Sequence, residues 1–322
     1  KACANVGDIE EGQRLHLDIV RKGFFETDVT VGNSLVDMYV KCGLVGIARV
    51  VFDKLPIKDV VSWNLLITGY IKHGYEEEAL NCFDSMQREG IVPDAITHLG
   101  TLMGCGRLVA IFKGQETHAE IVKRGLVEEA VNNTLIDMYV KCGTISQAEE
   151  VFDKILVHDV VSWTALVTGY AQHGYCQQAL NDIERMQVEG MNPDAVTFVC
   201  CIKSCTNLGN IVQGLELHAE IARKGLERDL LLASMLVDMY AKCGLLFEAE
   251  EVFNKLPVRG IIAWNVLISA YVEHKYNEKA ITYFDKMQLE GILPNAAIYV
   301  SILKACSYLG ALDKGQELHN DI

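Results

Sequence analysis

The sequence reads VVSWN at residues 60–64, VVSWT at residues 160–164 and IIAWN at residues 261–265, and this recurring stretch decides the fold. The three tryptophans lie 100 and 101 residues apart. A second motif keeps the same period, with DMYVKCG starting at Asp37 and Asp137 and DMYAKCG starting at Asp238. A regular internal period indicates stacked repeat units, so we expect function along a row of equivalent positions and not in one pocket.

The composition favours one large folded body. Half of the 322 residues are hydrophobic, and no apolar run approaches the roughly 20 residues that a membrane helix needs, so we expect a soluble protein with no membrane partner. The stretch KACANVGDIEEGQRLH at residues 1–16 returns as KACSYLGALDKGQELH at residues 304–319. The chain therefore begins and stops inside a repeat unit, and we interpret it as part of a longer protein.

Most of the 11 cysteines keep the phase of the repeat. Equivalent residues in stacked helical units lie roughly 10 Å apart, which is beyond the reach of a disulfide. We therefore interpret these cysteines as small buried hydrophobic residues in a reducing compartment. They form two equivalent sets: Cys42, Cys142 and Cys243 in one, and Cys3, Cys105, Cys205 and Cys306 in the other.

Each unit reads as a pair of helices. From Ser62 to about His73 apolar residues recur at helical spacing until Gly74, and a second amphipathic helix follows and ends at Gly90, with Pro93 just beyond. Paired helices of about 12 residues are too short to be stable alone in water, so they must stack. The sequence predicts an all-α fold, a right-handed α-solenoid of helix-turn-helix repeats.

Two families of helical repeats have units of about this length. Tetratricopeptide arrays hold a glycine four residues after the tryptophan, whereas Gly69 and Gly169 come six residues after it. The unit ends GIVPD, GMNPD and GILPN, together with MY-x-KCG and VVSW, instead resemble the pentatricopeptide repeat family, in its plant-type subclass of alternating P, L and S motifs. The resemblance covers the whole chain and implies a single array with a partial unit at each end.

On that alignment the units differ in length. The S-like units span residues 29–59, 129–159 and 230–260; the P-like units span 60–94, 160–194 and 261–295; the L-like units span 95–128 and 195–229, with partial L-like units at 1–28 and 296–322.

Positions 2, 5, 9 and 13 of a unit share one face of its first helix. In the first P-like unit they hold Val61, Asn64, Thr68 and Lys72. The set suits a nucleotide, because an aliphatic wall can lie beside the base, a polar group at its edge and a lysine near the phosphate. The candidate base-flanking residues are Thr30, Val61, Val161 and Ile262, and the candidate phosphate-binding residues are Lys41, Lys72, Lys141 and Lys242.

The resemblance implies single-stranded RNA as the partner, at about one base per repeat, read by the fifth and last residues of a unit. An asparagine carries a donor and an acceptor, and a neighbouring aspartate can hold that amide in one orientation. The implied pairs are Asn33 with Asp59, Asn64 with Asp94, Asn133 with Asp159, Thr164 with Asp194, Ser234 with Gly260, and Asn265 with Asn295. The fifth residues of the L-like units, Leu99, Val199 and Val300, offer no polar atom.

In that family Asn with Asp favours uracil, Thr with Asp favours guanine, and Asn with Asn favours a pyrimidine. With the protein N-terminus toward the RNA 5′ end, the expected target is roughly U-U-x-U-G-x-x-Y-x. Ser234 with Gly260 is interpreted as a spacer, because a glycine cannot orient the serine. The net charge of −14 argues against tight non-specific binding, so we expect a modest and salt-sensitive affinity.

Structural roles compete with some of these interpretations. Asn64 and Asn265 could satisfy backbone donors at a helix start, and Asp94 and Asp194 could be turn residues. The tryptophans fall one position off the reading face, which favours core packing over base stacking.

The sequence favours a binding module without catalytic residues, metal or cofactor. His118 and His218 each start an H-A-E match to half of a zinc deaminase signature, but no C-x-x-C follows and the slot recurs with the repeat. Cys200, Cys201 and Cys205 have the wrong spacing for a zinc knuckle. Any deaminase domain would lie outside this segment.

The leading hypothesis is therefore the targeting part of an organellar factor for C-to-U RNA editing or RNA processing, in a mitochondrion or chloroplast, with editing-complex proteins as further partners. The alternative is a protein-interaction scaffold whose groove holds a peptide. Polar fifth positions in the P-like and S-like units, and apolar ones in the L-like units, favour RNA.

Overall fold

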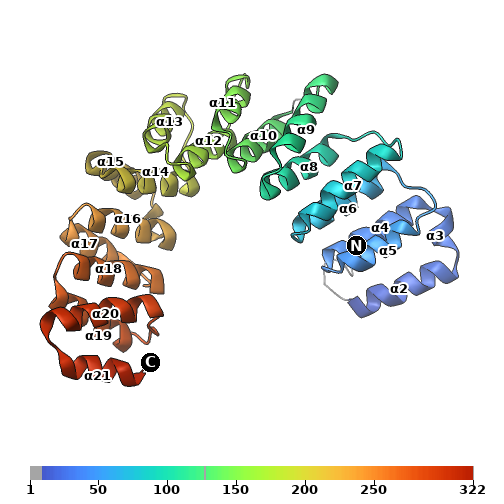
Figure 1. Ribbon diagram of the computed structural model, residues 1–322. Helices are drawn as coiled ribbons and strands as arrows, with labels where there is room; N and C mark the ends of the chain where they lie inside the picture. Colours follow the sequence, from blue (N-terminus) through green and yellow to red (C-terminus); the bar gives the residue numbers. More distant parts are fainter. Residues whose placement is uncertain (1–8, 127, 322) are drawn as a thin grey trace. The chain divides into compact units, whose positions relative to one another are not determined.

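The computed structural model describes residues 9–126 and 128–321 and consists of helical hairpins (Figure 1). Within these ranges there is no β-strand. The chain divides into two compact units, residues 1–158 and residues 159–322. The prediction of an all-α repeat fold is confirmed in both units.

In the first unit, the first helices of successive hairpins pack side by side, α4 on α6, α6 on α8 and α8 on α10, and each also contacts the second helix of its own hairpin. The helices are α2 (Ile9–Arg21), α3 (Phe24–Thr27), α4 (Val29–Lys41), α5 (Val45–Asp53), α6 (Val60–Lys72), α7 (Glu76–Arg88), α8 (Ala95–Leu108), α9 (Ile111–Arg124), α10 (Glu129–Lys141) and α11 (Ile145–Asp153).

The second unit repeats this order, with α12 packed on α14, α14 on α16, α16 on α18 and α18 on α20. Its elements are α12 (Val160–Gln172), α13 (Cys176–Val188), α14 (Ala195–Leu208), α15 (Ile211–Arg223), the short 3-10 helix η1 (Leu226–Arg228), α16 (Leu230–Lys242), α17 (Leu246–Lys255), α18 (Ile261–Glu273), α19 (Asn277–Leu289), α20 (Ala296–Leu309) and α21 (Leu312–Asp321).

A left-handed residue closes the turn inside each hairpin. Gly74 between α6 and α7 has φ 79°, which lets the Tyr75 N–H donate to the Tyr70 carbonyl at 3.0 Å. Lys275 holds the equivalent place in the third repeat with φ 65°, a conformation that costs a residue with a Cβ more than it costs glycine. The glycines that the sequence predicts to end the first helices therefore lie at the turns between the two helices of a hairpin.

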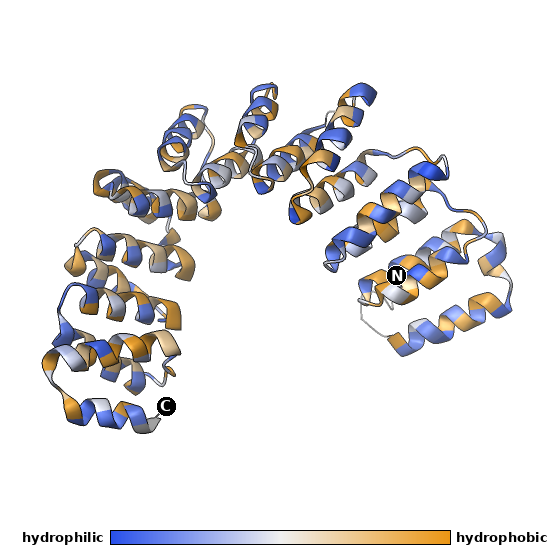
Figure 2. Cartoon of the chain, in the orientation of Figure 1, coloured by the Kyte–Doolittle hydropathy of each residue, from blue (hydrophilic) through white to orange (hydrophobic). Residues whose placement is uncertain are grey.

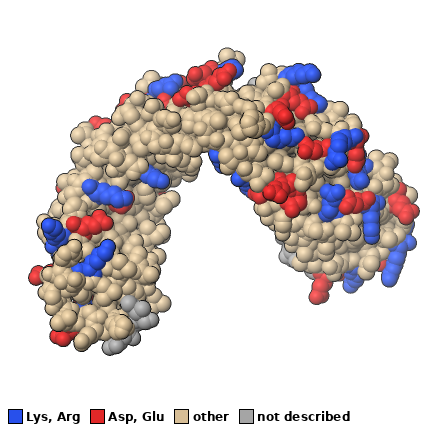
Figure 3. Space-filling view, in the orientation of Figure 1, with Lys and Arg blue, Asp and Glu red and all other residues tan. Residues whose placement is uncertain are grey.

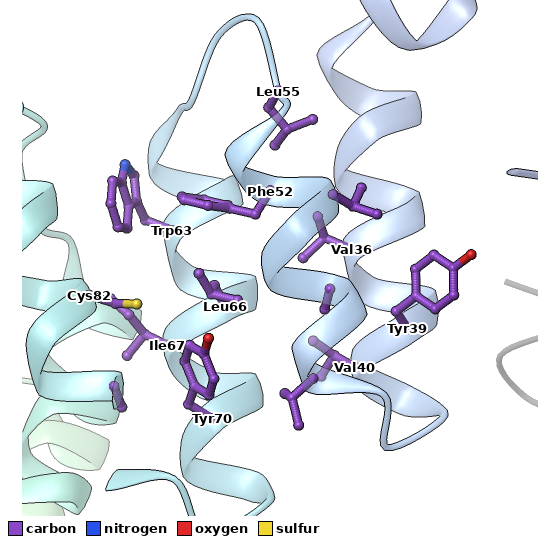
Figure 4. Close-up of a cluster of buried hydrophobic side chains, with 14 of the residues drawn as sticks. Val36, Tyr39, Val40, Phe52, Leu55, Trp63, Leu66, Ile67, Tyr70 and Cys82 are labelled. Atoms are coloured by element: carbon purple, nitrogen blue, oxygen red, sulfur yellow. The ribbon is translucent and has the colours of Figure 1, made fainter. Parts of the chain in front are cut away.

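The hydrophobic core lies between the helices. Figure 2 shows helices with one hydrophilic and one hydrophobic side, as the spacing of apolar residues requires. In the first unit the rings of Phe52 on α5 and Trp63 on α6 meet edge to face, with centroids 4.7 Å apart (Figure 4). Trp163 and Trp264 are also buried, so the prediction that the tryptophans pack in the core is confirmed.

The repeat-phased cysteines fall into two environments. One set is buried as predicted, and burial raises the pKa of Cys105 to about 12, so its thiol stays protonated. The other set is half-buried, so full burial was wrong for it. The ten cysteines in the part of the chain that the structure describes are free thiols, and Cys3 lies outside that part. The buried set is Cys105, Cys205 and Cys306; the half-buried set is Cys42, Cys142 and Cys243.

Among the described helices, none combines the length and the apolar character that crossing a bilayer requires.

His98 on α8 is a core residue with polar atoms that nothing satisfies. Its side chain is fully buried against the ring of Phe83, and neither ring nitrogen has a hydrogen-bond partner among the residues that the structure describes. The equivalent residues of the later repeats are the aromatic Phe198 and Tyr299. Burial lowers the pKa of His98, because a charged imidazole cannot be solvated there.

We expect His98→Phe to raise the free energy of unfolding by on the order of 1 kcal/mol, because it removes two unsatisfied buried nitrogens. The pKa of His98 is lower in the folded than in the unfolded state, so the wild type should lose stability as pH falls below about 6.5. The variant should lose less. Chemical denaturation at about pH 7.5 and about pH 5.5 measures both effects, with Phe198→His as the converse control. Equal stabilities of wild type and His98→Phe at both pH values would contradict this account.

Candidate nucleic-acid interface

The last residues of the predicted reading pairs, except Gly260, cap the first helices of the units that follow. Each side-chain oxygen accepts the backbone N–H of the third helical residue, the standard way to satisfy an otherwise unpaired donor at a helix start. The caps are Asp59 on α6 at 2.8 Å, Asp94 on α8 at 2.9 Å, Asp159 on α12 at 2.6 Å, Asp194 on α14 at 2.8 Å and Asn295 on α20 at 3.0 Å.

The first predicted pair comes together at the edge of a cavity. Asn33 on α4 donates from Nδ2 to Asp59 Oδ1 at 3.2 Å. A hollow of about 390 Å³ is lined by both residues and also by Thr30 and Val61, the two predicted base-flanking residues. Burial alone would raise the pKa of Asp59, but hydrogen bonds from Ser62 and Asn33 lower it, which favours the acceptor form. Both residues of the pair and the flanking candidates of two neighbouring units thus line one hollow.

The second predicted pair is the most completely bonded. Asn64 on α6 donates from Nδ2 to both carboxylate oxygens of Asp94, at 2.9 and 3.0 Å. Its Oδ1 accepts from the hydroxyl of Thr97 on α8 at 2.6 Å. Burial would raise the pKa of Asp94, but hydrogen bonds from Thr97 and Asn64 lower it. The amide of Asn64 is therefore fixed in one orientation.

Thr164 and Asp194 are joined through a third residue. The hydroxyl of Thr164 on α12 lies 2.8 Å from the hydroxyl of Thr197 on α14, and Thr197 donates to Asp194 Oδ1 at 2.8 Å. The carboxylate thus acts on Thr164 only through Thr197. Sequence comparison of the pair alone predicts a direct role for Asp194 and misses this relay.

The two later pairs are not joined. Ser234 on α16 donates back to the carbonyl of Leu230 at 2.6 Å, and Gly260 offers α18 no side-chain cap. Within residues 9–126 and 128–321, the buried Oδ1 of Asn265 has no hydrogen-bond partner, while Asn295 Oδ1 accepts from the backbone of Ile298. The remaining predicted pair, Asn133 with Asp159, has one member in each unit and stays a prediction.

One competing interpretation of the asparagines is wrong. Helix α6 is capped by Asp59 and helix α18 begins after Gly260, so neither Asn64 nor Asn265 satisfies donors at a helix start. For Asp94 and Asp194 the capping and pairing roles coexist.

Val61 and the two remaining base-flanking candidates are exposed apolar side chains on first helices. Val61, Val161 and Ile262 are 50, 59 and 62% exposed. Isolated apolar side chains at this degree of exposure are free to contact a flat ligand without unpacking the core. The fifth residues of the L-like units offer a ligand no hydrogen-bonding side-chain group; they are Leu99, Val199 and Val300.

Three of the four candidate phosphate-binding lysines are already paired. The aspartate of each DMY motif lies four residues before its lysine on the same helical face. Among the described residues Lys72 on α6 has no ion-pair partner, and its side chain is exposed. Figure 3 shows acidic and basic groups close together on the visible surface. The pairs are Lys41 with Asp37 at 2.7 Å, Lys141 with Asp137 at 2.5 Å and Lys242 with Asp238 at 2.8 Å.

Sequence analysis missed Thr97 and Thr197. The signal was present, because a threonine three residues after a capping aspartate is the spacing of a capping box. The pairing of the lysines was also readable from the D-x-x-x-K spacing of Asp37 and Lys41.

The repeated histidines have structural partners. His118 on α9 bonds through Nδ1 to the hydroxyl of Tyr139 at 2.8 Å, and His218 on α15 bonds to Tyr240 at 2.6 Å. Burial lowers the pKa of both histidines. No group of three histidine, cysteine, aspartate or glutamate side chains in residues 9–126 and 128–321 is arranged to hold a metal ion.

Comparison with known families agrees with this repeat geometry. The model described as PPR repeat family matches residues 58–107, 158–207 and 259–307, and the model described as PPR repeat matches residues 33–60, 133–160 and 233–261. Together they cover more than half of the chain. The chain belongs to the pentatricopeptide repeat family.

Similar proteins occur in Arabidopsis thaliana. Pentatricopeptide repeat-containing protein At5g27110 is 36% identical over 98% of this chain and 45% of its own length. The putative mitochondrial protein At3g11460 is 36% identical over 99% of this chain and 51% of its own. The chloroplastic protein At1g15510 is 32% identical over 99% and 37%. This chain therefore spans about half or less of the curated relatives named here.

A solved structure shares the fold. The crystal structure of pentatricopeptide repeat protein PPR10 in complex with an 18-nt psaJ RNA element superposes with a TM-score of 0.74 at 20% identity, over 100% of this chain and 54% of that one. The likeness establishes the α-solenoid fold.

Proposed function

We propose that this chain binds single-stranded RNA in a sequence-specific way, at about one base per repeat, through the exposed face of its first helices. The observation that carries the proposal is the joining of reading residues to carboxylates of the next hairpin. Asn33 reaches Asp59 at 3.2 Å and Asn64 reaches Asp94 at 2.9 Å. An amide held in one orientation presents a defined donor and acceptor, which is what reading a base edge requires.

The hollow at Asn33 supports the same function. Thr30 and Val61, which lie on neighbouring first helices, line it together with Asn33 and Asp59. A base placed between the two flanking side chains would meet the amide at its edge. The structure of PPR10 with an RNA element supports RNA as the ligand class.

We further assign the chain to the subclass with alternating P, L and S units. The helix lengths support this assignment, because the second helix of each S-like unit has 9 or 10 residues and that of each P-like unit has 13. Relatives named mitochondrial or chloroplastic support an organellar location. We also propose a role in C-to-U editing or RNA processing, with editing-complex proteins as partners. Any catalysis would lie outside this segment.

Selection of RNA ligands from a random pool tests the function. The expected consensus is roughly U-U-x-U-G-x-x-Y-x, with the N-terminal units at the 5′ end. Enrichment of no sequence, or of a sequence unrelated to the polar pairs, would refute base reading and favour the scaffold alternative.

The unpaired lysine makes a separate prediction. We expect Lys72→Ala to weaken binding of all RNA sequences alike and to reduce the slope of log affinity against log salt by about 1, because one phosphate contact is lost. Lys41→Ala is the matched control and should have the smaller effect, since Asp37 already neutralises Lys41 at 2.7 Å. Affinities measured across a salt series decide this, and an equal or larger effect of Lys41→Ala would contradict the assignment.

A further inference from the structure

The third residue of two L-like units connects base-reading residues to carboxylates. Thr97 and Thr197 are fully buried at the start of α8 and α14. The Thr97 hydroxyl lies 2.6 Å from Asn64 Oδ1 and 2.9 Å from an oxygen of Asp94. Each hydroxyl thus sits between the fifth residue of one unit and the residue that ends that unit.

The hydrogen bonds at Thr197 have a defined direction. A hydroxyl carries one proton, and an ionised carboxylate only accepts. Thr197 therefore donates to Asp194 at 2.8 Å and accepts from Thr164 at 2.8 Å. With its proton directed inward, Thr164 has lone pairs to offer a ligand and no donor.

The third repeat lacks this connection. Ile298 replaces the threonine, and the Oδ1 of Asn265 is enclosed with no hydrogen-bond partner among the described residues. Asn295 uses its own oxygen on the backbone N–H of Ile298 at 3.0 Å. In this repeat, where isoleucine replaces the threonine, the fifth residue is not linked to the last.

We infer that Thr97 and Thr197 are specificity-determining positioning residues, which act on the base through Asn64 and Thr164. This inference rests on the proposed RNA function and adds a third member to each reading pair. Because the Thr164 hydroxyl donates its proton to Thr197, its oxygen can only accept a hydrogen bond from a ligand. This matches a base with a donor at the facing position of its Watson–Crick edge. Guanine presents two donors there, N1–H and its amino group, whereas adenine presents an acceptor at N1 and a donor only at its N6 amino group.

The test is Thr197→Val, which keeps the shape of the side chain and removes only the hydroxyl. Thr206→Val on the same helix is the matched control, because in the described part of the chain the Thr206 hydroxyl bonds only to the Ile202 carbonyl, at 2.8 Å. The probes are RNAs of the expected pattern with G or A at the fifth base. We expect Thr197→Val to reduce the preference for G over A about tenfold, the effect of one lost hydrogen bond, and Thr206→Val to leave it unchanged.

The outcomes separate this inference from the proposed function. A wild type that prefers G and a Thr197→Val variant that prefers it equally would overturn the positioning role and leave RNA reading intact. A wild type with no preference would overturn both. Thermal unfolding of both variants checks that they are folded.

Ile298→Thr provides a gain-of-function arm that does not depend on the stability of Thr197→Val. The new hydroxyl would supply Asn265 Oδ1 with the donor that Thr97 gives Asn64. We expect a sharper preference for pyrimidine over purine at the eighth base. Unchanged selectivity at that base would count against the inference.

Discussion

Gly69→Ala should lower the free energy of unfolding by about 1 to 3 kcal/mol, the usual cost of overpacking a core. A Cβ on Gly69 would lie 2.7 and 2.8 Å from the two γ-carbons of Val40. Val40 is buried on α4 and is stiff about χ1, so it cannot turn away. The loss is measured by chemical denaturation.

Gly46→Ala is the matched control. Gly46 lies in helix α5, and a Cβ there would meet no described atom within 4 Å apart from the neighbouring backbone of its own helix, so alanine should be neutral or stabilise by up to about 1 kcal/mol. Destabilisation of similar size by both substitutions would show that the contact with Val40 is not the cause.

The third repeat indicates how the clash is relieved. Its equivalent residues are Ala241 and Ala270, both buried. The helices approach in the same way, because His73 bonds to the Val40 carbonyl at 2.7 Å and His274 bonds to the Ala241 carbonyl at 2.9 Å. The double variant Val40→Ala, Gly69→Ala should therefore be more stable than the sum of its single changes by at least about 1 kcal/mol. Simple additivity would contradict this packing account.

Thr164→Asn should move the preference at the fifth RNA base from G to U. The new amide would meet Asp194 and Thr197, the same residue types that hold Asn64 through bonds of 2.9 Å to Asp94 and 2.6 Å to Thr97. The expected change is on the order of 1 to 3 kcal/mol, the scale of one specific base contact. Affinities for four RNAs that differ only at that base measure it.

The reciprocal change is the control. Asn64→Thr should move the preference at the second base from U to G and leave the fifth base unaffected, because the two sites share no residue. If Thr164→Asn changed affinity for all four RNAs equally, its effect would be structural and the assignment of Thr164 as a reading residue would be wrong.

Most of the fold follows from local sequence. The glycine at Gly74 and the apolar spacing around Trp63 act within one hairpin, and the period of about 100 residues repeats such local signals along the chain. They therefore predict helices, turns and core without knowledge of distant contacts. His98 could not be predicted as an unsatisfied core residue, because its burial depends on packing against Phe83 of the preceding hairpin.

The site was less predictable for the same reason. The pair Asn64 with Asp94 follows from the family resemblance, but the hydroxyl of Thr97 that completes it depends on how α6 and α8 approach each other. Asn265 and Asn295 look equally good in sequence and are not joined. Pair identity alone therefore does not determine hydrogen bonding, since the residue three positions after the cap contributes.

The central claim is sequence-specific recognition of RNA by the joined reading pairs. Its most direct test is the affinity of the wild-type protein for an RNA of the pattern U-U-x-U-G-x-x-Y-x, compared with an RNA of the same composition in shuffled order at the same salt concentration. Several base contacts on the order of 1 kcal/mol or more each predict binding at least about tenfold tighter for the ordered RNA. Equal affinities for the two RNAs would contradict base reading and leave the exposed face of the first helices as a surface for another partner.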